Sequence, residues 1–345
     1  MTSPVVDERA VTELLDTRRA EINAAIDEDL PSAEPARLYD ASRYLLEAGG
    51  KRLRPTLLLL AAEALMDVEL GSEPYRSFPS LHDSRIDIMK AAVSIEVIQS
   101  FTLIHDDIMD DDELRRGVPA VHEAFDLETA ILAGDTLYSK AFEIMLQTGA
   151  PSDCSIRAIR LLAETCTQIC EGQALDIAFE DGSDVTIPEY RTMIERKTAV
   201  LFKAAAAVPA ILLGADDETV TALERYGLAV GEAFQIYDDV LDLIVPSDVL
   251  GKQRGSDLVE SKRTLITLHA ADNGVDIDTL QPERGDHQAI EAAVQELEAV
   301  GSIDFANDKA TELVQSGIDE LAILPDNEAR TMLADLARYL VERGY

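Results

Sequence analysis

The chain has 345 residues, and its 66 acidic against 30 basic side chains give a formal net charge of −36. Hydrophobic residues make up 47% of it, which excludes a disordered acidic tail and allows a large core. No basic patch appears, so we expect no nucleic-acid partner.

The charge pattern suggests a salty environment. Acidic residues are spread along the whole chain, and only eight of the 30 basic residues are lysines, the other 22 being arginines. Self-repulsion of this charge would strain a compact fold in dilute salt, and ionic strength of about 1 M screens it to a Debye length of about 3 Å. We expect a halophilic protein; an ordinary acidic protein is the alternative.

Residues 1–10 lack the basic and apolar regions of a signal peptide. The longest apolar stretches, Pro55–Met66 and Leu201–Ala215, are short or interrupted, so we expect no transmembrane segment. Three cysteines without a secretory signal favour reduced thiols and a cytoplasmic location. Cys166 and Cys170 are expected to pack in the core rather than to hold a metal.

Apolar residues recur at helical spacing over most of the chain, and almost no segment alternates with a period of two. The breaks fall at Gly-, Pro- and Ser-rich clusters. The sequence predicts an all-α fold, a single domain over residues 1–345 with roughly ten or more helices. The elements expected in chain order are a helix around Leu57–Leu65, a long loop over 67–87, helices over Ile156–Ile177, Tyr190–Leu213 and Val220–Leu243, a polar segment over 271–300 to which the pattern assigns no structure, and a helix over Glu328–Arg343.

Two aspartate clusters share the pattern D-D-x-x-D. The first comprises Asp106, Asp107 and Asp110, and the second comprises Asp238, Asp239 and Asp242. On a helix, positions i and i+4 share a face, so the outer two carboxylates of each cluster point the same way. Mg²⁺ prefers carboxylate oxygens and often shares them with substrate phosphates. Because acidic pairs also arise by chance in such a chain, the surrounding residues must support a metal site that grips a diphosphate.

Cations accompany both clusters. Arg115 and Arg116 follow the first, a Gly-Gly-Lys-Arg-Leu-Arg-Pro segment precedes it at 49–55, and Lys197-Thr198 stands between the two. Arginine forks and lysine ammonium groups are the usual ligands of phosphate oxygens. Gly251-Lys252 and Lys262 follow the second cluster, so four of the eight lysines lie near the two clusters, namely Lys51, Lys197, Lys252 and Lys262. Any one of them alone could be a surface ion pair of little weight.

Together these motifs resemble the trans-isoprenyl diphosphate synthases (polyprenyl synthetases), and Leu103–Asp110 is especially similar to the archaeal geranylgeranyl diphosphate synthases. The six motifs stand in that family's order, within about residues 40–270, at Gly49–Pro55, Asp106–Pro119, Gly172–Asp176, Lys197-Thr198, Phe234–Asp242 and Gly251–Lys262.

The resemblance implies a homodimer of helical bundles, each with a deep central cavity. It implies condensation of isopentenyl diphosphate with dimethylallyl, geranyl or farnesyl diphosphate to give geranylgeranyl diphosphate (C20). Three Mg²⁺ ions would be held by Asp106, Asp110 and Asp238, with Asp107, Asp239 and Asp242 as supporting ligands or their neighbours.

The same resemblance assigns the basic and polar residues. Arg115, Lys197 and Lys252 would hold the allylic diphosphate, and Lys51, Arg54 and Arg116 the isopentenyl diphosphate. Lys262 would add charge at the metal cluster, and Thr198 and Gln235 would turn oxygen dipoles toward a carbocation.

The chain departs from the family pattern at two positions. Gln99 stands where the family often has a histidine that contacts isopentenyl diphosphate, and an amide can still donate there. Ser261 stands where a glycine is common before Lys262, which puts the backbone path there in doubt.

Product length is expected to depend on Phe101 and Thr102, which lie somewhat more than one helical turn before Asp106. One aromatic residue at this place resembles the archaeal C20 synthases, and Phe101 as a plain core residue is the alternative. A C15 or C25 product, a non-catalytic subunit of a heteromeric synthase, a terpene cyclase and a metal-buffering protein remain as other functions.

Overall fold

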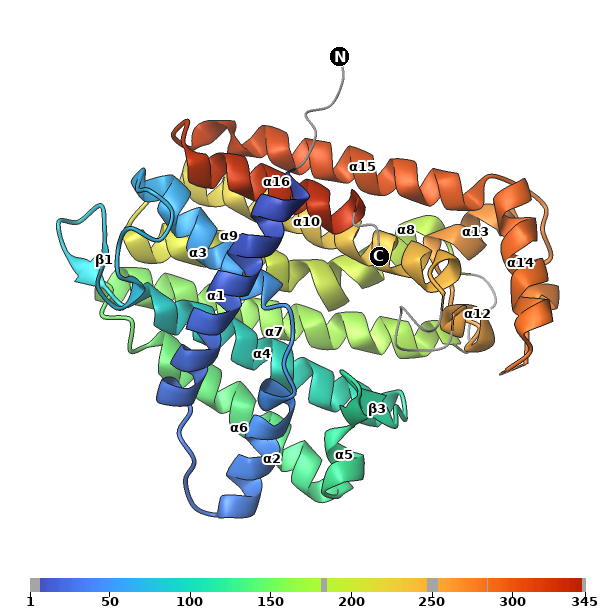
Figure 1. Ribbon diagram of the computed structural model, residues 1–345, viewed down its shortest axis with the longest axis horizontal. Coiled ribbons are helices and arrows are strands. Elements are labelled where there is room, and N and C mark those ends of the chain that lie inside the picture. The colour runs from blue at the N-terminus through green and yellow to red at the C-terminus, as the bar shows by residue number, and fades with distance from the viewer. Residues whose placement is uncertain (1–6, 181–184, 247–253, 284, 343–345) are drawn as a thin grey trace. The chain divides into compact units, whose positions relative to one another are not determined.

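The computed structural model describes residues 7–180, 185–246, 254–283 and 285–342, so Lys252 lies outside the described residues (Figure 1). The all-α prediction is confirmed, because within those ranges the strands are confined to two hairpins with two residues in each strand. Contacts divide the chain into two compact units. Unit 1 comprises 1–167, 201–227 and 320–336, and unit 2 comprises 168–200, 228–319 and 337–345. The single domain stays a prediction.

Unit 1 contains the N-terminal helices and both hairpins. Its elements are α1 (Glu8–Asp29), α2 (Ala36–Glu47), α3 (Leu53–Met66), η1 (Tyr75–Ser77), β1 (Phe78–Pro79), β2 (Arg85–Ile86), α4 (Ile88–Met109), β3 (Leu114–Arg115), β4 (Val118–Pro119), α5 (Val121–Ala124), α6 (Leu127–Met145) and η4 (Leu321–Ile323), together with most of α9 (Val200–Leu213). The hairpin β1–β2 lies in the expected loop 67–87. Helices α7 (Ser152–Glu180), α10 (Asp217–Ile244) and α16 (Glu328–Glu342) begin in unit 1 and end in unit 2.

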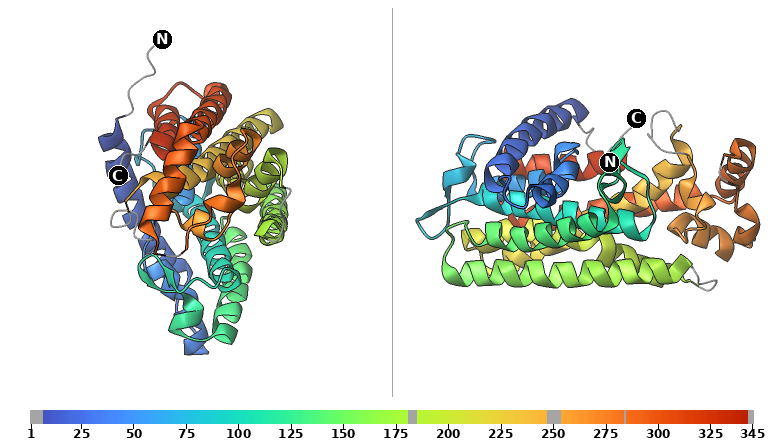
Figure 2. Two further views of the ribbon diagram at one scale, coloured as in Figure 1. Left: turned by 90° about the vertical axis from the view of Figure 1, so that its right-hand side faces the viewer. Right: turned by 90° about the horizontal axis from the view of Figure 1, so that it is seen from below.

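Helix α4 is the core of unit 1 and runs antiparallel to α6, as Figures 1 and 2 show. The Ser94 hydroxyl donates to the Ala141 carbonyl at 2.8 Å, and the ring of Phe101 meets that of Tyr138. In the part of the chain that the structure describes, α4 alone has the length and apolar composition of a membrane span. Because 72% of that apolar window is buried in the fold, packing against α3 and α6 accounts for its composition.

Unit 2 contains a short α-helix that continues directly into a π-helical segment. Its elements are α8 (Ile187–Ile194), the π-helical segment η2 (Glu195–Ala199), α12 (Ser256–Val259), α13 (Leu265–Asp272), η3 (Ile277–Leu280), α14 (His287–Ala299) and α15 (Ser302–Glu320). The helix expected over Tyr190–Leu213 is therefore interrupted by a π-turn. π-Turns of this kind are frequent at functional sites.

The other helices predicted from the sequence are present in the structure. Helices stand at the places expected around 156–177, 220–243 and 328–342, and α14 occupies part of the unassigned segment 271–300. Cys166 is buried but Cys170 is exposed, so the expectation of core packing is right for Cys166 only.

Candidate active site

The first aspartate cluster stands at the C-terminal end of α4. Asp106 and Asp107 lie in its last turn, and the backbone N–H of Asp110 caps the helix by donating to the Asp106 carbonyl at 2.9 Å. Asp107 is fully buried, whereas Asp106 and Asp110 are partly exposed. The two outer carboxylates are therefore placed for a solvent-borne ligand, and the middle one is not.

Asp107, near the end of α4, forms an ion pair with Arg115 of the hairpin β3–β4. The Arg115 Nε donates to Asp107 Oδ1 at 2.6 Å, and its Nη2 also donates to Asp112 at 2.8 Å. Burial raises the pKa of Asp107 against the opposing pull of Arg115. The other oxygen, Oδ2, is buried without a hydrogen-bond partner among the described residues. Asp107 thus fixes the arginine predicted to hold the allylic diphosphate.

The two arginine-containing motifs of unit 1 touch each other. A β-carbon at Gly50 would lie 2.9 Å from the Arg116 guanidinium carbon, so the missing side chain makes room for the arginine. Nη1 of Arg116 donates to the carbonyls of Leu45, at 2.9 Å, and Gly49. The hairpin residue Arg116 has a φ of 54°, which turns it toward this loop.

One buried carboxylate organises these cations. Glu96, on α4, accepts from Arg52 Nη1 at 2.5 Å, and Arg116 Nη2 lies 3.8 Å from the same oxygen. Burial lowers the pKa of Arg116 and also that of Arg54, the latter to about 10. The Arg54 guanidinium lies 4.3 Å from the centre of the Phe202 ring, and Lys51 is exposed. Three guanidinium groups around one carboxylate leave a net positive site for an anion.

The predicted chain-length residues share α4 with the first cluster. Phe101 is 8% exposed, and its ring centre lies 5.1 Å from that of His105 and 5.3 Å from that of Tyr138. Thr102 donates its hydroxyl to the backbone carbonyl of Gln99 at 2.9 Å. Phe101 thus packs edge-on against α6 in an aromatic cluster, and its role in product length stays a prediction.

Unit 2 contains a cavity that gathers six of the predicted residues. Those six are Lys197, Thr198, Gln235, Asp238, Asp239 and Lys262. The walls also include residues to which the sequence assigned no role, namely Asp176, Phe179, Tyr190, Met193, Ile194, Asp257, Arg263 and Thr264. Cations, carboxylates and hydroxyl groups therefore line one concave surface, as a diphosphate site requires.

The π-turn carries Lys197 and Thr198 into this cavity. Two glycines let neighbouring helices come close to it: a β-carbon at Gly172 would lie 2.6 Å from Lys197 Cα, and one at Gly231 would lie 2.5 Å from Ala199 Cα. Lys197 Nζ donates to Asp176 Oδ2 at 2.5 Å. Gly172 and Asp176 belong to one predicted motif, and both residues contact Lys197.

Asp239 is held by two side chains. Tyr190 donates its hydroxyl to Oδ2 at 2.6 Å, and Gln235 donates its amide to Oδ1 at 2.9 Å. The Thr198 hydroxyl in turn donates to the Gln235 amide oxygen at 2.9 Å. Burial raises the pKa of Asp239, and the charge of Asp257 adds to this.

The end of the second cluster meets the segment before Lys262. Asp242 is buried and accepts from the Ser256 hydroxyl at 2.7 Å and from the Asp257 N–H at 3.1 Å. Burial alone would lower the pKa of Lys262, but Asp257 and Glu260 outweigh it and raise that pKa. Lys262 therefore keeps its charge.

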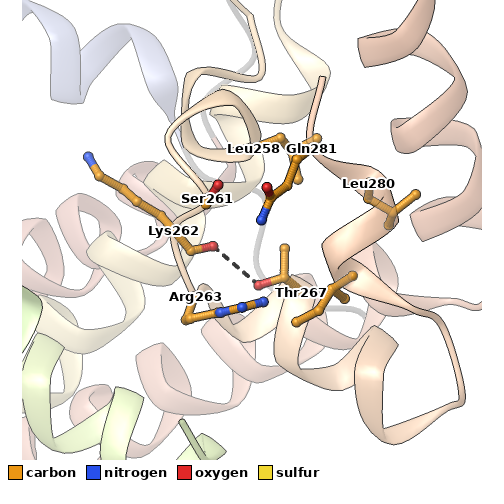
Figure 3. Close-up of a pocket in the computed structure, with 8 residues that line it drawn as sticks. Leu258, Ser261, Lys262, Arg263, Thr267, Leu280 and Gln281 are labelled. Atoms are coloured by element: carbon orange, nitrogen blue, oxygen red, sulfur yellow. Dashed lines mark hydrogen bonds between the residues drawn. The ribbon is translucent and has the colours of Figure 1, made fainter. Parts of the chain in front are cut away.

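Ser261 adopts a φ of 60°, a left-handed conformation that favours glycine. This backbone conformation explains why a glycine is common at this position in the family that the sequence resembles. Figure 3 shows the small pocket that Ser261 shares with Gln281 and Thr267. In it the Lys262 side chain extends away from the other labelled residues, while its carbonyl accepts from Thr267.

The carboxylates fit Mg²⁺ shared with a substrate better than a site made by protein alone. Among the described residues, no three carboxylate, imidazole or thiol groups come together closely enough to hold a metal. Mg²⁺ is commonly bound by one or two carboxylates together with phosphate oxygens and water. The partly exposed Asp106 and Asp110, one turn apart, suit that chemistry. The first cluster belongs to unit 1 and the second to unit 2, so their joint action stays a prediction.

The sequence reading missed several of these partners. Arg52 and Asp176 lie within recognised motifs, so their positions were a usable signal. Glu96 and Tyr190 stand outside every motif, and their sequence neighbours give no sign of the contacts they make.

Comparison with known proteins gives a consistent result. A family model described as polyprenyl synthetase matches residues 35–298. A geranylfarnesyl diphosphate synthase of Natronomonas pharaonis is 65% identical over the whole of both chains. A geranylgeranyl diphosphate synthase of Methanosarcina mazei is 47% identical over 95% of this chain and 96% of its own.

Solved structures agree with the sequence matches. The geranylgeranyl pyrophosphate synthetase from Geoglobus acetivorans is 41% identical, with a TM-score of 0.86 over 96% of this chain and all of its own. A geranylgeranyl pyrophosphate synthase from Corynebacterium glutamicum, solved with isoprenyl diphosphate and magnesium, is 26% identical, with a TM-score of 0.80 over 99% of this chain and all of its own.

Proposed function

The chain belongs to the polyprenyl synthetase family and is a short-chain trans-prenyl diphosphate synthase, and we propose that its main product is geranylgeranyl diphosphate (C20). It adds isopentenyl diphosphate head-to-tail to dimethylallyl, geranyl or farnesyl diphosphate. The observation that carries the proposed prenyl transfer is the unit 2 cavity, which is lined by Lys197, Thr198, Gln235 and Lys262 together with Asp238.

The allylic diphosphate is bound by Arg115, Lys197 and Lys252, and Lys262 adds charge at the metal cluster. Arg115 is already oriented by Asp107, and Lys197 by Asp176. Both cations thus enter the reaction with their geometry fixed, which lowers the cost of ordering them around the substrate.

Isopentenyl diphosphate is bound by the cationic loop of unit 1. Arg54 and Arg116 face the shared carboxylate of Glu96, Lys51 is exposed beside them, and the Gln99 amide stands one turn further along α4. Two guanidinium groups and an ammonium group match the charge of a diphosphate.

Asp106, Asp110 and Asp238 would hold three Mg²⁺ ions, which, when bound, neutralise the allylic diphosphate and make it a leaving group. The magnesium in the Corynebacterium glutamicum structure supports this cofactor. Asp107, Asp239 and Asp242 act through the residues that they orient. Thr198 and Gln235 turn oxygen dipoles toward the electron-poor allylic carbon, and the departing diphosphate accepts the proton that the product loses.

Phe101 supports a C20 product, because it places one aromatic ring on the helix that ends at the first cluster. A second candidate product is geranylfarnesyl diphosphate (C25). It is favoured by the 65% identity to the Natronomonas pharaonis synthase, which exceeds the 47% identity to the Methanosarcina mazei C20 synthase.

We further propose that the enzyme is a cytoplasmic homodimer that supplies the chains of isoprenoid ether lipids. The exposed apolar residues of α6, Leu127, Ile131, Leu132 and Tyr138, support a partner on that helix.

Product chromatography tests the proposal. The purified protein, in high salt with Mg²⁺, is given labelled isopentenyl diphosphate and each of the three primers, and the products are dephosphorylated and separated by length. A dominant C20 alcohol supports the main proposal, and a dominant C25 alcohol supports the second candidate. A folded protein that elongates no primer would refute both and favour a non-catalytic subunit.

A further inference from the structure

Four side chains of unit 2 form one continuous chain of hydrogen bonds at the edge of the cavity. It runs from Thr198 through Gln235 to Asp239, and Tyr190 closes it from the far side. Gln235 and Asp239 are one turn apart on α10, while Tyr190 and Thr198 lie on the run of α8 and its π-turn. The contacts therefore tie α10 to the π-turn through Thr198 and to α8 through Tyr190.

The direction of these hydrogen bonds follows from chemistry. The Gln235 amide nitrogen donates to Asp239 Oδ1, an arrangement that suits an ionised carboxylate, and the amide oxygen therefore faces Thr198. The Thr198 hydroxyl donates its only hydrogen bond to that oxygen, at 2.9 Å. What Thr198 can offer to the cavity is therefore lone pairs, which suit an electron-poor carbon.

Tyr190 completes the arrangement by occupying the second carboxylate oxygen. Asp239 is 7% exposed and Tyr190 is 1% exposed, so few waters can replace the phenol. Without that donor, Oδ2 would be buried unsatisfied, and the carboxylate would gain by turning toward another donor. Such a turn would release the Gln235 amide and, with it, the direction of the Thr198 hydroxyl.

We propose that Tyr190 and Asp239 are positioning residues that fix the Gln235 amide, so that Thr198 presents its lone pairs to the allylic cation. The inference rests on the proposed prenyl transfer. It separates Asp239 from the metal-holding role of Asp238, because each Asp239 oxygen already accepts a hydrogen bond from a side chain.

Tyr190→Phe is the variant that tests this, and Tyr226→Phe is its matched control. Tyr226 is also fully buried, and its hydroxyl donates to the Leu333 carbonyl at 2.8 Å within unit 1. Removing one direct transition-state donor typically costs about 10²–10³ in kcat. Acting through two intervening side chains, Tyr190→Phe is expected to lower kcat by about tenfold, with both KM values within about twofold of wild type.

Analogue binding gives a readout that a structural role would not move. The probes are a diphosphate carrying an ammonium group in place of the allylic cation, and the neutral thiolo analogue of dimethylallyl diphosphate. Tyr190→Phe should weaken the ammonium analogue by about tenfold and leave the neutral one unchanged, because only the former resembles the transition state. Tyr226→Phe should change neither.

A double-mutant cycle with Thr198→Val locates the effect. If Tyr190 acts through Thr198, the phenylalanine substitution adds little once the hydroxyl has gone. Additive losses would overturn the inference, as would Tyr190→Phe matching Tyr226→Phe, or a rise in the allylic KM at constant kcat. A wild-type protein that makes no product would overturn the proposed function instead, and the analogue titration would still test the hydrogen-bond chain.

Discussion

Gly172 of α7 lies against the backbone of Lys197, so that a β-carbon on the glycine would stand 2.6 Å from Lys197 Cα. The contact explains why the motif at 172–176 belongs to the site: its glycine admits the π-turn, and Asp176 then binds the Lys197 ammonium group. The placement of the catalytic lysine therefore depends on a missing side chain in a neighbouring helix.

Gly172→Ala is accordingly expected to displace the π-turn and to lower kcat/KM by at least tenfold. Overpacking costs about 1–3 kcal/mol of stability, so a control of equal strain is needed. Gly227→Ala provides it, since a β-carbon there would lie 2.6 Å from Lys203 Cα in unit 1. Steady-state kinetics at matched stability would contradict the account if both variants lost activity equally.

Substitution of Phe101 should change product length. Its ring fills the space between α4 and α6 beside Tyr138, so Phe101→Ala opens room near the end of the growing chain. We expect a product at least one C5 unit longer than that of the wild type, measured by chromatography of the dephosphorylated alcohols.

Phe78→Ala is the matched truncation for that experiment, because Phe78 is also buried but stacks on Tyr75 in the first hairpin. Both truncations should destabilise the fold by about 3–5 kcal/mol. An unchanged product from Phe101→Ala would show that Phe101 is a core residue with no role in product length.

Adjacent arginines should affect different substrates. Arg115 is held by Asp107, whereas Arg116 is held by backbone carbonyls beside Gly50. A lysine keeps the charge but loses the fork, and a lost charge-assisted hydrogen bond is worth about 1.5–3 kcal/mol, or about tenfold and more in affinity. Arg115→Lys should raise the KM of the allylic primer, and Arg116→Lys that of isopentenyl diphosphate. Initial rates with each substrate varied in turn would contradict the assignment if both variants raised the same KM.

The net charge of −36 predicts that salt stabilises the fold. Raising KCl from about 0.1 M to about 1 M shortens the Debye length from about 10 Å to about 3 Å and screens carboxylate repulsion. Tm should therefore rise clearly with KCl in a thermal unfolding scan, and more than with sucrose at equal osmolality. Equal effects of KCl and sucrose would rule out charge screening as the cause.

Much of this structure could be predicted because local patterns determine it. The helical period and the glycine-rich breaks predict α3, α7, α9, α10 and α16 but do not assign α1, α6 or α15, and the spacing of Asp106 and Asp110 places both at one helix end. The buried residues of α14, Ile290, Ala293, Val294 and Leu297, also have helical spacing, although the polar residues between them mask the pattern.

The rest depends on contacts between distant residues, which no local pattern reports. Tyr190 and Asp239 are 49 positions apart, and only the packing of α8 against α10 makes them partners. Glu96 is a polar residue in an apolar helix, and its partners Arg52 and Arg116 lie 44 and 20 positions away in the sequence. The π-turn at 195–199 likewise lies against two helices that approach it closely at glycines, Gly172 and Gly231.

The measurement that tests the central claim most directly is single-turnover condensation. Excess protein in high salt is mixed with Mg²⁺, farnesyl diphosphate and labelled isopentenyl diphosphate, and the formation of an elongated prenyl diphosphate is followed in time. The account predicts a C20 product that forms only with Mg²⁺ and is lost in Asp106→Ala and in Asp238→Ala. A folded wild-type protein that leaves the label in isopentenyl diphosphate would contradict it.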